Sequence, residues 1–129
     1  MPAVPAAPAM PAIKQARAAL DALLSAYAGG QLVDAEARLE PSMIGRQILI
    51  EQMRQSTAQQ KQIRLLLRDT QATLGSGDVV LIVTAWEKRF LLVPALAPTL
   101  RSGRSTFLLQ RDGDGWKLVG QSGDSPFGP

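Results

Sequence analysis

The feature that most constrains this chain is a single change of hydrophobic period near Gln62. Before this point, apolar residues recur every three or four positions, which is typical of amphipathic helices. After it, apolar residues alternate with polar ones or form β-branched and aromatic runs, which favour strands. All helical patterns therefore precede all strand patterns in a chain of 129 residues. This order predicts an α+β domain whose helices cover one face of an antiparallel sheet.

Three helices are predicted in the first half of the chain. The first follows an apolar stripe over residues 13–27 and ends at Gly29-Gly30, because glycine adopts the left-handed cap conformation at little cost. The second covers about residues 32–39 and is closed by Pro41, which lacks an amide donor. The third covers about residues 45–60.

Four strands with short connections are predicted after the change of period. An Asp-Gly turn over residues 112–115 is expected to join the last two strands, since these residues tolerate the positive φ of tight hairpins. Pro94, Pro98 and Gly103 indicate a loop over residues 94–103. The predicted strands begin near Gln62 and cover residues 79–93, 105–111 and 116–121.

This order resembles the nuclear transport factor 2-like superfamily, which includes ketosteroid isomerase, scytalone dehydratase and polyketide cyclases. The segments that carry the resemblance are ALDALLSAYAGGQLVDAEARL, IGRQILIEQMRQ and GRSTFLLQRDGDGWKLVGQSGDSPF, within about residues 13–127. The resemblance implies a cone-shaped fold, with three N-terminal helices packed on a curved antiparallel sheet of about four strands. Enzymes of the family usually carry an extra strand or hairpin between the second and third helices. This chain has only residues 40–44 there, so its pocket mouth is expected to differ.

The chain is predicted to hold one domain, over residues 12–129. Residues 1–11 read MPAVPAAPAMP, a Pro/Ala-rich tract that favours extended structure and is interpreted as a linker or a disordered tail. The tract has no basic start or long apolar centre, so it is no signal peptide. No stretch approaches the roughly 20 apolar residues of a membrane span. The compartment stays open between the cytoplasm and, if the tract links to a longer protein, the periplasm.

The absence of three residue types limits the reactions and metal sites that this chain can support. The chain contains no Cys, His or Asn, which excludes disulfides, thiolate nucleophiles, imidazole bases and Cys/His zinc sites. We expect no metal site and no cofactor, because the acidic turn at residues 112–115 lacks the longer ligand ladder of a calcium loop. The formal charge of +3 is scattered along the chain. This distribution predicts no nucleic-acid surface.

The resemblance implies a small conical pocket. Tyr27 lies where the first-helix tyrosine of ketosteroid isomerase would fall, and Asp69 continues the inward register of Leu67. Tyr27 and Asp69 are therefore the candidate catalytic residues, against the alternative that Tyr27 packs in the core with a tethered hydroxyl. The predicted pocket residues are Tyr27, Leu67, Asp69, Trp86 and Phe107.

Charged residues in the long strand allow two interpretations. Glu87, Lys88 and Arg89 either form cross-strand ion pairs on an exposed face, or Lys88 or Arg89 recognises an anionic group near Trp86. Asp124 is a further pocket candidate. A hydrolase relay of Asp, Arg and Asp, assisted by Asn in family members, is disfavoured because the chain has no Asn.

These observations favour a non-catalytic module that binds a small apolar ligand or a protein. By analogy with relatives, we expect a homodimer through the open sheet face. One alternative is a small-molecule isomerase, dehydratase or hydrolase that uses Asp69 with Tyr27, so the question of enzyme activity stays open. Another alternative is a scaffold domain of a larger envelope assembly, suggested by the Pro/Ala tract. Burial of Asp69 beside Tyr27 would favour the enzyme.

Overall fold

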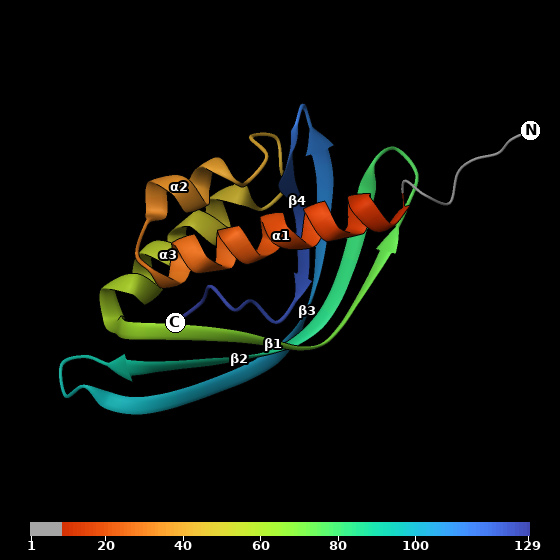
Figure 1. Ribbon diagram of the computed structural model, residues 1–129. Coiled ribbons are helices and arrows are strands. Elements are labelled where there is room, and N and C mark those ends of the chain that lie inside the picture. The colour runs from red at the N-terminus through yellow and green to blue at the C-terminus, as the bar shows by residue number, and fades with distance from the viewer. Residues whose placement is uncertain (1–8) are drawn as a thin grey trace, which may run out of the picture.

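The helices precede the strands in the structure, a computed structural model that describes residues 9–129 (Figure 1). The four strands form one antiparallel sheet in the order β1-β2-β3-β4. The predicted α+β class, the three helices and the four-stranded sheet are confirmed. The elements are α1 (Ala9–Ala28), α2 (Leu32–Ala37), α3 (Arg46–Gln59), β1 (Gln60–Leu74), β2 (Val79–Leu92), β3 (Ala97–Asp112) and β4 (Gly115–Gly123).

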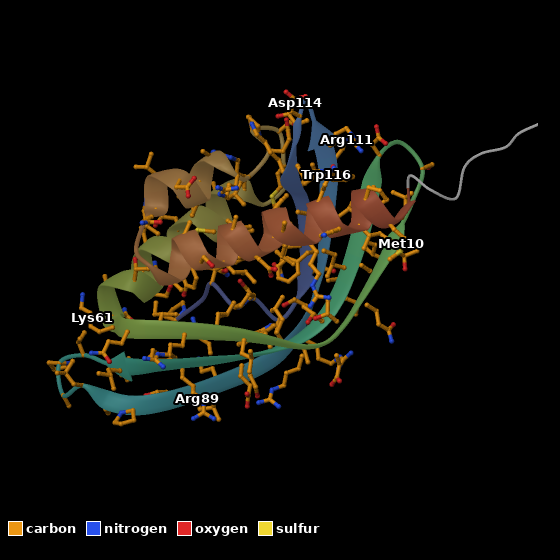
Figure 2. All side chains as sticks on the ribbon, viewed as in Figure 1. Met10, Lys61, Arg89, Arg111, Asp114 and Trp116 are labelled. Atoms are coloured by element: carbon orange, nitrogen blue, oxygen red, sulfur yellow. The ribbon has the colours of Figure 1, made fainter. Side chains whose placement is uncertain are left out.

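The sheet curves strongly, and α1 lies across its concave face (Figure 1). The apolar stripe of α1 is buried against inward-facing residues of the middle strands, such as Ile82 and Phe107. Trp116 of β4 closes the core beside α1, where its indole N–H donates to Oε1 of Gln15 at 3.2 Å (Figure 2). Burial of this apolar surface is the main stabilising contribution to a domain of this size.

Helix α1 begins earlier than the predicted domain boundary at residue 12. It starts at Ala9, and Pro11 lies in its first turn, where a missing amide donor costs no helical hydrogen bond. The prediction of a linker or tail was therefore wrong for residues 9–11, and its residues 1–8 lie outside the described part. No helix among residues 9–129 combines the length and apolarity of a membrane span.

Strand β3 begins at Ala97, inside the loop predicted over residues 94–103 and eight residues before the predicted start of the strand at residue 105. It pairs with the whole of β2, from Leu92–Ala97 to Val79–Gln110. The glycine that suggested a loop, Gly103, lies opposite Trp86 in the ladder. A Cβ atom there would lie 2.7 Å from the Trp86 ring and 2.7 Å from the Asp124 side chain. Close packing, and not a turn, therefore requires glycine at this position.

The segment after β4 returns under the helices and completes the core. Phe127 is fully buried, and its ring packs edge-on against Tyr27 with centroids 5.2 Å apart. Its carbonyl oxygen accepts a hydrogen bond from the Ser56 hydroxyl of α3 at 2.8 Å. The C-terminal end lies between α3 and β1 in Figure 1. This segment therefore links the helical layer to the sheet.

Replacing Phe127 with Ala should lower the free energy of unfolding by about 3–5 kcal/mol, because a fully buried aromatic side chain is removed. Urea unfolding followed by circular dichroism measures the change. Val33→Ala, at a position that is 84% exposed, serves as the control and should change stability by less than about 0.5 kcal/mol. Equal effects of the two substitutions would show that the C-terminal segment is not part of the core.

Candidate functional site

A buried lysine on β2 is the centre of the candidate site. Even-numbered residues of β2 face the helices, and this inward row includes Thr84, Trp86 and Phe90, all buried. Lys88 occupies the same row and is only 1% exposed. Lysine is rarely buried to this extent, because removal of an ammonium group from water is costly. Its position therefore requires compensating partners.

The partners of Lys88 are neutral oxygens and aromatic rings. Its Nζ donates to the carbonyl oxygen of Gly128 at 2.7 Å and to Oη of Tyr27 at 3.0 Å. The same atom lies 5.4 Å from the ring centroid of Tyr27 and 5.5 Å from that of Phe90, within the range of cation–π attraction. Among residues 9–129, no carboxylate forms an ion pair with Lys88.

A directional hydrogen-bond chain extends from Lys88 into the core. Oη of Tyr27 lies 2.7 Å from Oγ of Ser56. An ammonium group can only donate, so Tyr27 accepts from Lys88 and donates to Ser56. Ser56 then donates to the carbonyl oxygen of Phe127. Tyr27 is thus an oriented hydroxyl beneath the lysine, held by residues of α3 and the C-terminal segment.

Burial shifts the pKa of both groups. It lowers the pKa of Lys88 to about 8, and the positive charge of Arg101 adds to this effect. It raises the pKa of Tyr27 to about 12, against the opposing effect of its hydrogen bond with Ser56. Near neutral pH, Tyr27 is therefore a neutral hydroxyl. Lys88 is mostly protonated there, and a small rise in pH deprotonates a large fraction of it.

Lys88 lines an open cavity of about 720 Å³. Its walls come from β2, β3, α3 and the C-terminal segment, and they include Trp86, Arg101, Gln52 and Asp124. Arg101 lies directly opposite Lys88 in the β2–β3 ladder, so the two cations share one face. Asp124 supplies the one acidic side chain of the lining, and its Oδ2 accepts the backbone N–H of Arg104 at 3.0 Å. Two cationic side chains, Lys88 and Arg101, therefore share the cavity with one acidic side chain.

The five predicted pocket residues do not form one pocket. Trp86 lines the cavity, and Tyr27 lies below it as the hydrogen-bond partner of Lys88. Phe107 is fully buried in the core. Leu67 lines a separate depression between β1 and α1, and Asp69 is exposed. Of the predicted residues, only Trp86 and Tyr27 therefore belong to the Lys88 site.

Asp69 does not continue the inward register of β1 as predicted. The pairing of β1 with β2 shifts between Arg68 and Gln71, and Asp69 has a positive φ of 51°. This bulge interrupts the alternation that placed Leu67 and Asp69 on one face. The sequence gives no clear signal for such a bulge, because Asp and neighbouring Thr70 are compatible with either face.

The charged residues of β2 lie on different faces of the sheet. Glu87 forms the expected cross-strand ion pair with Arg68 at 2.6 Å, on the outer face of the sheet. Arg89 lies on the side of the sheet away from the helices (Figure 2). Lys88 points the opposite way, beside Trp86 in the cavity lining. Its place in the apolar even-numbered row was the sequence signal for this burial.

Metal-binding clusters of acidic side chains are not found among the described residues. Asp112 and Gly115 pair across a tight turn, and Gly113 has a φ of 62°. The residues 112–115 therefore form the hairpin turn that the Asp-Gly pattern predicted.

The fold has clear relatives among solved structures, although no protein-family model and no curated protein sequence matches the chain. A nuclear transport factor 2-like superfamily protein from Salmonella enterica superposes with a TM-score of 0.75 at 11% identity, covering 91% of this chain and 92% of the other. The chain has the nuclear transport factor 2-like fold. The predicted resemblance is confirmed at the level of the fold.

Two further relatives show how varied this fold is. A candidate dehydratase of the same fold family from Streptomyces avermitilis gives a TM-score of 0.74 at 16% identity, covering 87% of this chain and 94% of the other. The association domain of Caenorhabditis elegans calcium/calmodulin-dependent protein kinase II gives 0.65 at 14%, covering 82% and 89%. The nuclear transport factor 2-like fold thus accompanies both enzyme-like and association-domain proteins, so function must be argued from the site.

Replacing Lys88 with Met should change how stability depends on pH. An unfolded lysine has a pKa of about 10.4, whereas that of Lys88 in the folded chain is about 8. Between these values the unfolded state binds more protons, so the stability of the original protein rises with pH. Below about pH 8 both states are protonated, and the cost of burying the charge is fully present.

Relative to Lys88→Met, the original protein should therefore gain up to about 3 kcal/mol of stability between about pH 7 and pH 10. Urea unfolding of both proteins across this range measures the difference. Lys61→Met, at an exposed position (Figure 2), is the matched control and should give a nearly constant difference. A constant difference for Lys88→Met as well would contradict the lowered pKa.

Proposed function

We propose that this domain is a non-catalytic module that binds a small anionic ligand in the cavity beside Lys88. The observation that carries the proposal is a buried ammonium group without a carboxylate partner among the described residues, in the wall of an open cavity. The proposal revises the apolar ligand expected from the sequence. An anion would supply the charge that the protein itself does not place beside Lys88.

Hydrogen-bond counting supports an acceptor at this position. A protonated lysine has three N–H donors, and Gly128 and Tyr27 take two of those of Lys88. The third is free for a ligand oxygen or water. Arg101, on the opposite strand, adds a second positive charge with a planar guanidinium suited to a carboxylate. A carboxylate between these two cations satisfies both.

The remaining lining favours a ligand with an apolar part. Trp86 offers an aromatic surface in this lining. The indole N–H of Trp86 already donates to Ser105 at 2.8 Å, so its ring orientation is fixed before any ligand binds. Asp124, across the cavity, would repel a second negative charge. We therefore infer a monocarboxylate with a small apolar or aromatic group.

The geometry gives less support to the alternative enzyme that uses Asp69 with Tyr27. Asp69 is exposed on β1, whereas Tyr27 is fully buried and reaches the cavity only through Lys88. An acid–base pair must meet at the same substrate atoms. Asp124 is the acidic side chain that lines the cavity, but its carboxylate is held by the Arg104 amide. Binding therefore remains the favoured function.

Benzoate is a suitable first probe, because it combines one carboxylate with one aromatic ring. Isothermal titration calorimetry should detect binding that is at least about tenfold tighter than that of benzyl alcohol, its neutral analogue, since charge-assisted hydrogen bonds to cations contribute about 1.5–3 kcal/mol. Affinity should fall as pH rises through about 8, where Lys88 loses its charge.

Two variants complete this test. Lys88→Met should weaken benzoate binding more than tenfold, or by about 1.4 kcal/mol. The matched control is Arg111→Gln, which removes a cation that lies over Trp116, outside the cavity, and should leave the affinity unchanged. Equal binding of benzoate and benzyl alcohol, or equal effects of the two variants, would refute an anion site at Lys88.

The outer face of the sheet supports a second proposal, that the domain self-associates there. Exposed leucines on this face, Leu66, Leu81 and Leu100, form an apolar surface that nothing in the described chain covers. The fold relative named as an association domain is in keeping with this role. The face also carries arginines at positions 64, 68, 89 and 104, of which Arg68 forms an ion pair with Glu87.

This charge excess gives the homodimer a specific signature. Two copies joined through the outer face would bring their arginines together, so salt should screen the repulsion and strengthen the dimer. Sedimentation velocity at low and high salt measures the effect. Leu66→Arg should abolish the dimer, whereas Val33→Arg on the exposed side of α2 should not. A monomer at every salt concentration would contradict the proposal.

A further inference from the structure

We propose that Lys88 forms a reversible imine with the carbonyl group of a 2-oxo acid bound in the cavity. The inference rests on the proposed anion site and names its ligand class. It follows from the placement of Lys88, which lines the cavity and whose Nζ makes two hydrogen bonds within the protein and forms no ion pair with a described residue.

The two hydrogen bonds orient the amine for attack. A neutral amine has two N–H donors and one lone pair. Gly128 and Tyr27 occupy the two donor directions, at 2.7 Å and 3.0 Å. The lone pair then takes the remaining tetrahedral direction, which is the one left open for a ligand. The hydrogen bonds that hold the ammonium form therefore also position the amine as a nucleophile.

The surroundings favour the neutral form that this reaction needs. Burial and the nearby Arg101 lower the pKa of Lys88, and the neighbouring Tyr27 stays a neutral hydroxyl. The charged or titratable side chains around Lys88 are Tyr27 of α1, Arg101 of β3 and Asp124 of the C-terminal segment. Of these, only Asp124 is acidic, and no ion pair joins it to Lys88 among the described residues.

The reaction is a condensation without any change of oxidation state. The amine lone pair forms a C–N bond with the carbonyl carbon while the π electrons of the C=O bond move to oxygen. One proton passes from nitrogen to that oxygen, which gives a neutral carbinolamine. The hydroxyl group then leaves with the second nitrogen proton as water, and a C=N bond forms.

The cross-strand geometry selects a 2-oxo acid. Lys88 and Arg101 are directly opposite in the ladder, a relation that places the Cβ atoms of a pair about 4.5–5.5 Å apart. In a 2-oxo acid the carbonyl carbon and the carboxylate are adjacent. The carboxylate can therefore meet the Arg101 guanidinium while the carbonyl carbon reaches Lys88. The side chain of the acid would extend toward Trp86.

Reductive trapping tests this inference directly. The full chain is incubated with pyruvate and sodium cyanoborohydride near pH 8, where Lys88 is about half deprotonated. Hydride reduction converts an imine to a stable secondary amine, so the protein should gain the mass of pyruvic acid less one oxygen atom. Peptide mapping should place a single adduct on Lys88 and not on Lys14, Lys61 or Lys117. Acetone, which lacks the carboxylate, should react at least tenfold more slowly.

Three variants separate the reaction from its alternatives. Lys88→Met should give no adduct, and Lys61→Met should react as the original protein does, since Lys61 is exposed on β1 away from the cavity. Lys88→Arg keeps a cation but cannot form an imine, so it should bind benzoate and give no adduct. Circular dichroism and urea unfolding establish that each variant is folded.

The outcomes distinguish this inference from the proposed function. An adduct confined to Lys88 supports imine formation, and a faster reaction with pyruvate than with acetone supports selection by the carboxylate. Benzoate binding without any adduct on Lys88 would overturn the imine and leave the anion site intact. Adducts spread equally over all lysines would overturn it as well. Loss of both benzoate binding and trapping would overturn both proposals.

Discussion

The hydrogen bonds that stabilise the buried ammonium group of Lys88 connect every layer of this domain. Lys88 of β2 donates to Tyr27 of α1 and to the carbonyl oxygen of Gly128 in the C-terminal segment. Tyr27 is joined in turn to Ser56 of α3, which donates to Phe127. Because a buried charge is tolerated only when its donors are satisfied, the sheet, both long helices and the C-terminal segment must be positioned together. The cavity wall is assembled by the same contacts.

The two faces of the sheet present different kinds of side chain to a possible partner. The inner face presents two cations and an oriented aromatic ring to an open cavity, so it favours a small anionic molecule. The outer face presents exposed leucines among arginines, so it favours a large partner surface. β2 separates these roles through simple alternation, since Lys88 and Arg89 are neighbours in sequence and lie on opposite sides. The proposed ligand site and the proposed association surface therefore lie on opposite faces of one strand.

Most of the fold was predictable, because it follows from local patterns. The apolar period of α1, the Gly29-Gly30 stop and the Asp-Gly turn each identify an element boundary without any tertiary information. The loop predicted over residues 94–103 was correct for residues 94–96 and wrong for residues 97–103, because Gly103 resembles a turn residue locally. Its real role is to let Trp86 and Asp124 approach the backbone, from segments 17 and 21 positions away in the sequence. Asp69 was misplaced for a similar reason, since a β-bulge leaves no local signature there.

The sequence by itself determined the order of helices and strands, the face that each β2 residue occupies, and the absence of Cys and His chemistry. These properties depend on residue type and on periods of two and 3.6 residues, both of which act over short distances. Only the tertiary structure decided that Lys88 is buried beside a cavity and that Asp69 is exposed. The pKa of Lys88 and its free donor direction depend on Tyr27, Arg101 and Gly128, which are distant in sequence and meet only when the sheet curves around α1.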